Sequence, residues 1–240
     1  MQGSGFAQFD PSAAARLEWA YRFRAEESGA LTDPQCGSEL APVVSNAVAN
    51  TQMQAPPAGN NWVAAACVVP RLFSPEECTR ILAFEDKLQL EAGRMVRPGL
   101  STRRCLYAWM DHADDNAWVY ERIVQSVHSA NQNYRYDLFG MMDPLQFTRY
   151  DSDRADEIGW HLDCGEGPNT TRKLSVSIQL SDPDAYEGGD LEFHAMPPLA
   201  FSRLQGAAIL FPAFLSHRVT PITQGSRYSL VAFINGPPFR

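Results

Sequence analysis

The chain has 240 residues, of which 45% are hydrophobic and 20% are charged, and this composition excludes a mostly disordered protein. A chain of this length can bury a sizeable core without disulfide or metal staples. The 20 Lys and Arg against 28 Asp and Glu give a net charge of -8, which argues against general binding to nucleic acids or to an anionic membrane.

The termini and the cysteines predict a cytoplasmic protein. The sequence does not begin with a basic segment followed by an apolar run, and its longest apolar stretch, residues 63–70, is too short to span a bilayer. The 5 cysteines are odd in number, scattered and without a C-x-x-C pair. This pattern argues against a disulfide framework or a structural zinc site, so we expect reduced thiols.

Two parts of the chain differ in character. Residues 1–60 are expected to form an N-terminal arm or lid, with one helix near residues 13–27 and a linker that contains Pro and Gly. Residues 61–240 are expected to form the main domain, which opens with a strand at residues 63–69.

Two helices are predicted in the first half of the main domain. Ser74-Pro-Glu-Glu77 combines an N-cap, a Pro at the first helical position and a Glu at the third, which is a capping box. We expect this helix to end near Gly93. A second helix is predicted from about Asn116 to Tyr134, where apolar residues recur at helical spacing and face a sheet.

After Gly140 the pattern changes to short apolar segments separated by turn residues. The predicted strands are 145–150, 159–163, 173–180, 190–194, 207–211, 217–220 and 227–234. Strands at this spacing favour a barrel or sandwich over alternating βαβ units. We predict an α+β fold, a jelly-roll core buttressed by the preceding helices. In 173–180 the polar residues alternate with apolar ones, so the polar face should line a cavity and the apolar face should pack on the helices.

A possible metal site begins with His161 and Asp163, which lie two residues apart and therefore share one face of a strand. His217, at the head of a later strand, could supply a third ligand. Two His and one carboxylate leave the opposite face of a metal open, which suits non-haem Fe(II) oxygen chemistry. A surface His beside a solvated Asp would give the same short pattern.

Arg227 lies ten residues after His217, across the segment 221–225. We expect a hairpin return that directs it into the same cavity as His217. A buried guanidinium needs an anionic partner and binds carboxylates through two parallel hydrogen bonds. A metal with open positions and such an Arg together predict a small oxo-acid cosubstrate.

Several segments resemble the iron(II)/2-oxoglutarate-dependent oxygenases, in particular their prolyl 4-hydroxylase-like branch. They are Gly159-Trp-His-Leu-Asp163, residues 172–192 with Gly188-Gly189, Gly206-Ala-Ala-Ile-Leu-Phe-Pro212, His217 and the basic residue Arg227. The resemblance covers about residues 62–240. It implies a double-stranded β-helix that holds Fe(II) through His161, Asp163 and His217, with the distal carboxylate of 2-oxoglutarate on Arg227.

The resemblance also implies a reaction. O2 and 2-oxoglutarate would be converted to succinate and CO2 while an unactivated C–H of a prolyl or other aminoacyl group is hydroxylated, in an amino acid, a peptide or a protein. Asp163 favours hydroxylation over halogenation, while desaturation and epimerisation stay open. Tyr150 matches a Tyr that helps to bind 2-oxoglutarate in relatives, although a core tyrosine fits equally well. Gln179 matches a position that is often Tyr, so its role is in doubt.

Two other classes of function remain as alternatives: a jelly-roll metal-binding or regulatory protein without this chemistry, and a zinc enzyme that uses the same three ligands. The sequence does not indicate the oligomeric state or the primary substrate. Five residues near strand ends could line a substrate entrance: Arg103, Arg104, Trp109, Arg149 and Trp160.

Overall fold

The computed structural model describes residues 66–93 and 102–239. The expected N-terminal arm, residues 1–60, and the boundary at residue 61 lie outside the described residues. None of the described helices is long and apolar enough to cross a membrane.

Two antiparallel sheets face each other. The larger sheet has the order β1-β10-β7-β12-β5-β4-β2, with β8 also paired to β12, and the smaller sheet has the order β3-β6-β11-β9. The strands of the larger sheet are β1 (Cys67–Val69), β2 (Glu91–Ala92), β4 (Leu106–Met110), β5 (Leu145–Asp151), β7 (Arg172–Gln179), β8 (Tyr186–Gly188), β10 (Ala208–Pro212) and β12 (Ile222–Asn235). Those of the smaller sheet are β3 (Arg103–Arg104), β6 (Glu157–His161), β9 (Leu191–Phe193) and β11 (His217–Val219).

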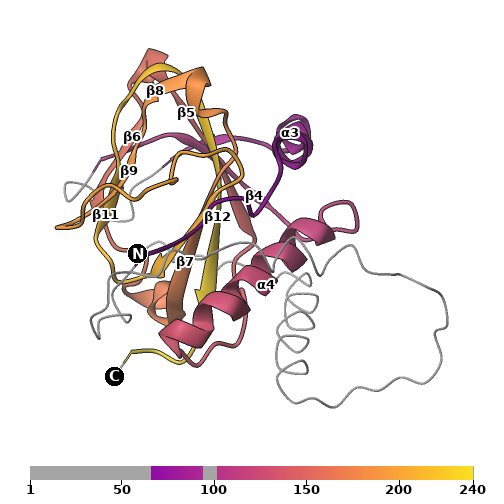
Figure 1. The fold of residues 1–240 in the computed structure, drawn as a ribbon, viewed down its shortest axis with the longest axis vertical. Coiled ribbons are helices and arrows are strands. Elements are labelled where there is room, and N and C mark those ends of the chain that lie inside the picture. The colour runs from indigo at the N-terminus through magenta and orange to yellow at the C-terminus, as the bar shows by residue number, and fades with distance from the viewer. Residues whose placement is uncertain (1–65, 94–101, 240) are drawn as a thin grey trace, which may run out of the picture.

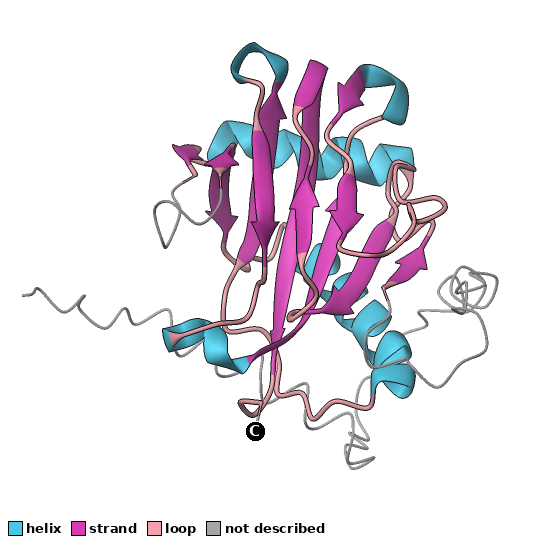
Figure 2. Ribbon diagram, turned by 90° about the vertical axis from the view of Figure 1, so that its left-hand side faces the viewer, coloured by secondary structure: helices cyan, strands magenta, loops and turns pink. Residues whose placement is uncertain are grey.

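Helices cover the outer face of the larger sheet. Figure 1 shows α3 (Pro75–Leu82) and α4 (Ala117–Tyr134) on one side of the strands and β6, β9 and β11 on the other. Figure 2 shows the strands in front with helical segments behind them. The shorter 3-10 segments are Ala83–Lys87, Ser152–Arg154, Gly167–Thr171 and Pro183–Ala185. The predicted α+β jelly roll, buttressed by helices on one sheet, is therefore confirmed.

The main core lies between α4 and β7. Ile123 and Val127 of α4 pack in one cluster with Leu174, Val176 and Ile178 of β7, and all five are fully buried. The alternation of β7 therefore places its apolar side chains under the helices, as the sequence predicts, and its polar side chains between the sheets.

The start of α3 follows the predicted capping box, because Ser74 Oγ accepts a hydrogen bond from the Glu77 amide and the Glu77 carboxylate accepts one from the Ser74 amide. The expected end near Gly93 is wrong. The helix ends at Leu82, a 3-10 turn follows to Lys87, and Glu91–Ala92 pairs with β4. The backbone groups of that segment are satisfied by strand pairing and not by a helix.

All eight predicted strands exist, since the one expected at residues 63–69 corresponds to β1 in its described part, whereas β2, β3, β4 and β8 were missed. The hairpin return expected between His217 and Arg227 is wrong. β11 pairs with β6 and β9, while β12 begins at Ile222, earlier than expected, and pairs with β5, β7 and β8. His217 and Arg227 therefore lie on opposite sheets and face the same interior from two sides.

Candidate metal centre and anion pocket

Three side chains converge between the two sheets. One ligand atom from each of His161, Asp163 and His217 lies within 4.8 Å of the other two. The Asp163 carboxylate is 3.6 Å from His161 Nε2 through Oδ1 and 3.5 Å from His217 Nε2 through Oδ2. His161 and His217 are direct cross-strand partners in β6 and β11. This spacing suits a single cation held by two imidazoles and one carboxylate.

Backbone carbonyls orient both imidazoles. His161 Nδ1 lies 2.9 Å from Gly159 O, and His217 Nδ1 lies 2.8 Å from Leu215 O. A proton on Nδ1 satisfies these carbonyls and directs the lone pair of each Nε2 towards Asp163, the tautomer that metal ligands adopt. Burial lowers the pKa of His161 and the neighbouring His217 lowers it further, which favours the neutral ligand form.

The larger sheet holds Asp163. Because β6 ends at His161, Asp163 lies beyond the strand and the expected same-strand geometry does not position it. Its amide donates to Ala213 O at 2.9 Å, and Ser175 Oγ of β7 donates to Asp163 Oδ2 at 2.6 Å. Burial raises the pKa of Asp163, but His217, His161 and the Ser175 hydrogen bond outweigh burial, so the net pKa is lowered. The carboxylate is therefore ionised.

Arg227 is buried opposite the triad, with 3% of its surface exposed. It is the cross-strand partner of Tyr150, and its Cζ lies 5.2 Å from the centroid of that ring. Its Nε donates to Gln179 Oε1 at 3.0 Å, and Gln179 Nε2 donates to the Tyr186 hydroxyl at 2.9 Å. Among residues 66–93 and 102–239, no Asp or Glu forms an ion pair with Arg227. A buried guanidinium without a carboxylate fits a pocket for an anionic ligand.

The Gly188-Gly189 pair makes room for this arginine. Gly189 has a φ of +64°, and a Cβ there would lie 2.3 Å from Ile222 Cδ1 and 3.0 Å from Arg227 Cδ. Any side chain at this position would displace the Arg227 stem, so the glycine is required by space as well as by backbone conformation.

The structure therefore brings together all six residues singled out from the sequence: His161, Asp163 and His217 on one side, and Arg227, Tyr150 and Gln179 on the other. The sequence analysis missed the support that Ser175 gives to Asp163 and that Tyr186 gives to Gln179. The polar alternation in β7 did indicate that Ser175 faces the cavity, although nothing local shows which group it contacts.

Of the five suggested entrance residues, three point elsewhere. Arg104 is paired with Glu157 at 2.9 Å and is exposed. Arg149 packs over Tyr228 on the helix side of β5 and is paired with acidic residues there. Trp160 lies on the outer face of the smaller sheet with the Arg218 guanidinium over its ring. Arg103, opposite Ile158 of β6, and Trp109, opposite Gln146 of β5, remain as candidates.

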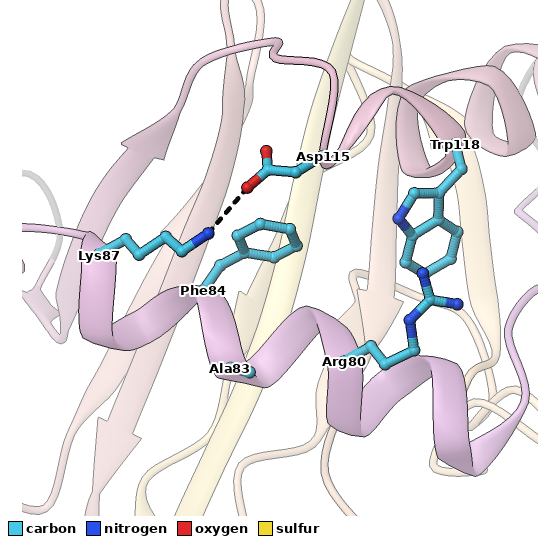
Figure 3. A pocket seen from close by; sticks show the side chains of 6 residues that line it. All are labelled: Arg80, Ala83, Phe84, Lys87, Asp115 and Trp118. Carbon is cyan, nitrogen blue, oxygen red and sulfur yellow. Dashed lines mark hydrogen bonds and ion pairs between the residues drawn. The ribbon is translucent and has the colours of Figure 1, made fainter.

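A separate hollow of ≈ 270 Å³ lies beside the helices, away from the triad. Figure 3 shows Lys87 and Asp115 closing it with a 2.8 Å ion pair, and the Arg80 guanidinium lies 4.5 Å from the centroid of the Trp118 ring. Its charged groups already have partners within the fold, and it offers no set of metal ligands. We therefore assign no chemistry to it.

Comparisons with known proteins agree with the site. The chain is 36% identical over 85 residues to a PKHD-type hydroxylase of Synechococcus sp. (strain CC9605), which covers 35% of this chain and 38% of that relative. It is 27% identical over 182 residues to a PKHD-type hydroxylase of Nitrobacter winogradskyi, covering 69% and 75% of the two chains. The first alignment thus spans well under two thirds of that relative's length. No family model matches the sequence.

Solved structures share the fold. A prolyl-4-hydroxylase of Pseudomonas putida superposes with a TM-score of 0.54 and 18% identity, covering 72% of this chain and 94% of that one. An oxidoreductase of the 2OG-Fe(II) oxygenase family from Burkholderia pseudomallei gives a TM-score of 0.54 and 22% identity, covering 77% and 96%. These likenesses confirm the double-stranded β-helix, and with the relatives they confirm the resemblance found in the sequence.

Proposed function

We propose that this chain is an Fe(II)/2-oxoglutarate-dependent dioxygenase that hydroxylates an unactivated C–H of a prolyl or other amino-acid or peptide substrate. One observation carries the proposal: three side chains that can bind a metal face a buried arginine across one interior, and no described carboxylate is paired with that arginine. Hydroxylation is supported by the relatives, which are PKHD-type hydroxylases, and a prolyl substrate by the prolyl-4-hydroxylase that shares the fold.

The triad would hold the iron. Nε2 of His161, Nε2 of His217 and the Asp163 carboxylate provide the nitrogen and oxygen donors that suit Fe(II), and no described thiol joins them. The backbone carbonyls at Gly159 and Leu215 keep both imidazoles in the required tautomer. When bound, iron and 2-oxoglutarate supply the oxidation of the C–H bond by O2, with succinate and CO2 as the other products.

Arg227 would bind the distal carboxylate of 2-oxoglutarate. Gln179 accepts a hydrogen bond from Nε, so the carboxylate would contact the terminal nitrogens of the guanidinium, on the side where Arg227 also contacts the Tyr150 hydroxyl. Tyr150 contributes its hydroxyl beside them, and burial raises the pKa of that hydroxyl above its usual range, so it stays a donor. Gln179 would therefore orient Arg227 and would not itself bind 2-oxoglutarate.

The substrate would approach from the side of His161. The side chain of His161 is 25% exposed, whereas that of His217 is 6% exposed, so the centre is more open at His161. Residues 61–240 would form the oxygenase domain and residues 1–60 an arm or lid over it. The described cysteines Cys67, Cys78, Cys105 and Cys164 are free, which supports a reducing, cytoplasmic compartment.

An anaerobic titration tests the proposal. Fe(II) is added first and 2-oxoglutarate second, and the visible charge-transfer band of a chelated 2-oxo acid is followed. A saturable band in the wild-type protein, absent in Asp163→Ala, supports it. Exposed Asp153, which belongs to no ligand set, provides the matched control Asp153→Ala. Iron binding without a band would contradict the proposal and favour a zinc enzyme or a metal-binding protein.

A further inference from the structure

A second arginine near the triad has no carboxylate partner among residues 66–93 and 102–239. The Nε–H of Arg103 in β3 is buried, and no oxygen or nitrogen of a described residue accepts a hydrogen bond from it. The Cys105 thiol lies beside it, but burial raises the pKa of that thiol, so it is a neutral neighbour and not a counter-charge. Gly93 covers the stem, since a Cβ added there would lie 3.1 Å from both Cγ and Nε of Arg103. The guanidinium itself lies 4.9 Å from the centroid of the Tyr107 ring. The side chain is thus held in place without a counter-charge.

The acidic residues nearby are already engaged. Arg154 is paired with Asp156, and Arg104, the next residue in the same strand, is paired with Glu157 at 2.9 Å. In residues 66–93 and 102–239, no carboxylate lies within ion-pair distance of Arg103. Among the described residues, Arg104 therefore has a counter-charge at this edge of the sheet and Arg103 does not.

Arg103 faces the site. It is the cross-strand partner of Ile158, in the strand that ends at His161. Tyr107, under its guanidinium, pairs with Thr148 and therefore shares the cavity face of the sheet with Tyr150. Burial raises the pKa of Tyr150, and the positive charge of Arg103 opposes this rise as a smaller effect.

Two aromatic side chains lie between Arg103 and the protein surface. Tyr107 contacts Trp109 edge to face with ring centroids 6.2 Å apart, and Trp109 is 39% exposed. The two rings form an aromatic wall between the guanidinium and the surface. A flat or apolar part of a substrate can lie on this wall while a charged part reaches Arg103.

We propose that Arg103 binds a carboxylate of the primary substrate, which makes this enzyme selective for carboxylate-bearing amino acids or peptides. The inference rests on the proposed function, because it assumes that Arg227 is occupied by 2-oxoglutarate. A divalent metal, Arg227 and Arg103 bring positive charge to the site, and Asp163 is the carboxylate that the described residues set against it. After Asp163 and the 2-oxoglutarate dianion have both been counted, one positive charge is left. A carboxylate of the substrate neutralises that charge.

Matched pairs of probes test the proposal by calorimetry. The protein is loaded with Mn(II), which binds the same donors without turnover, in the presence of 2-oxoglutarate. L-proline is compared with L-prolinamide, acetyl-Gly-Pro with its amide, and acetyl-Pro-Asp-amide with acetyl-Pro-Asn-amide. The pairs distinguish a free amino acid, a C-terminal carboxylate and an acidic side chain. We expect at least one carboxylate to bind about tenfold more tightly than its neutral partner.

The variants assign the preference to Arg103. Arg103→Gln should abolish the preference for the carboxylate probe over its neutral partner and leave the 2-oxoglutarate affinity unchanged. Arg103→Lys should retain part of this preference, and Arg104→Gln should retain all of it. Thermal unfolding of each variant shows that the fold is kept. The inference fails if no pair shows a preference, if the preference survives in Arg103→Gln, or if Arg103→Gln weakens 2-oxoglutarate binding as Arg227→Gln does.

The proposed function has its own readout. If the wild-type protein forms no charge-transfer band with Fe(II) and 2-oxoglutarate, the oxygenase assignment fails. An Arg103-dependent preference for carboxylates in the Mn(II) titration would still stand in that case. The two failures are therefore distinguishable.

Discussion

The hydroxyl of Ser175 donates a 2.6 Å hydrogen bond to the carboxylate of Asp163. This contact joins the larger sheet to a metal ligand that follows a strand of the smaller sheet, so the relative position of the two sheets sets the geometry of the centre. His161 is oriented by Gly159 of its own strand and His217 by Leu215, just before β11. Asp163, by contrast, follows β6 and is held by Ser175 of the larger sheet.

Ser175→Ala should weaken metal binding by about 10–100-fold, because the carboxylate loses the group that orients it and helps to keep it ionised. Mn(II) affinity measured by titration is the test. Ser177→Ala is the matched control, since Ser177 lies two residues along the same buried face and no hydrogen bond joins it to Asp163. Equal affinities in the two variants would show that the contact does not matter.

Arg227→Gln should raise the 2-oxoglutarate concentration needed for the charge-transfer band by about 100-fold, because charge-assisted hydrogen bonds contribute roughly 1.5–3 kcal/mol. Metal affinity should change little. Arg218→Gln is the control, as Arg218 is half-buried on the outer face of the smaller sheet and paired with Glu192 at 2.7 Å. An unchanged 2-oxoglutarate requirement in Arg227→Gln would remove Arg227 from the pocket.

Gly189→Ala should also weaken 2-oxoglutarate binding, because the new Cβ collides with Ile222 and with the Arg227 stem. Strain at the positive φ contributes about 1–3 kcal/mol of instability in addition. Gly167→Ala distinguishes the effect of the collision from the effect of the backbone strain. Gly167 has the same φ of +64°, but a Cβ there meets nothing within 4 Å. If both variants bind 2-oxoglutarate equally well, the collision does not affect the pocket.

The lowered pKa of Asp151 predicts that the free energy of unfolding depends on pH. Burial opposes its ionisation, but hydrogen bonds from Ser226 and Arg149 and the charge of Arg154 outweigh burial and lower its pKa. A carboxyl with a lowered pKa stabilises the fold above its unfolded pKa of about 3.9, and this contribution is lost as the pH falls through the folded value. Asp151→Asn should cost about 1–3 kcal/mol at pH 7.

Denaturant unfolding of Asp151→Asn and the wild type across a pH series is the measurement. The difference in the free energy of unfolding should shrink as the pH falls below the folded pKa, where the wild-type carboxyl is also neutral. Asp153→Asn, on an exposed residue two positions away, serves as the control. A difference that stays constant with pH would show that the charge of Asp151 does not contribute.

Local patterns predicted much of this protein. The capping box at Ser74, the apolar stripe of α4 and the alternation of β7 are each encoded within a few residues, and each appears as expected. The H-x-D pair, the later His217 and Arg227 occur in an order that resembles a known family, which identified the candidate ligands before any geometry was known. Short strands without strong alternation, such as Arg103–Arg104, were missed because two residues carry no period.

The sequence by itself therefore determined which residues could hold a metal and an anion, because residue type and short-range periodicity are local properties. Only the tertiary structure decided how they are held. His217 and Arg227 face each other from two sheets and not across a hairpin, and Asp163 is positioned by Ala213 and Ser175. Arg104 is paired with Glu157, whereas Arg103 has no carboxylate partner in the part of the chain that the structure describes. These relationships depend on the pairing of strands that are distant in sequence, and no local pattern specifies which distant strands will meet.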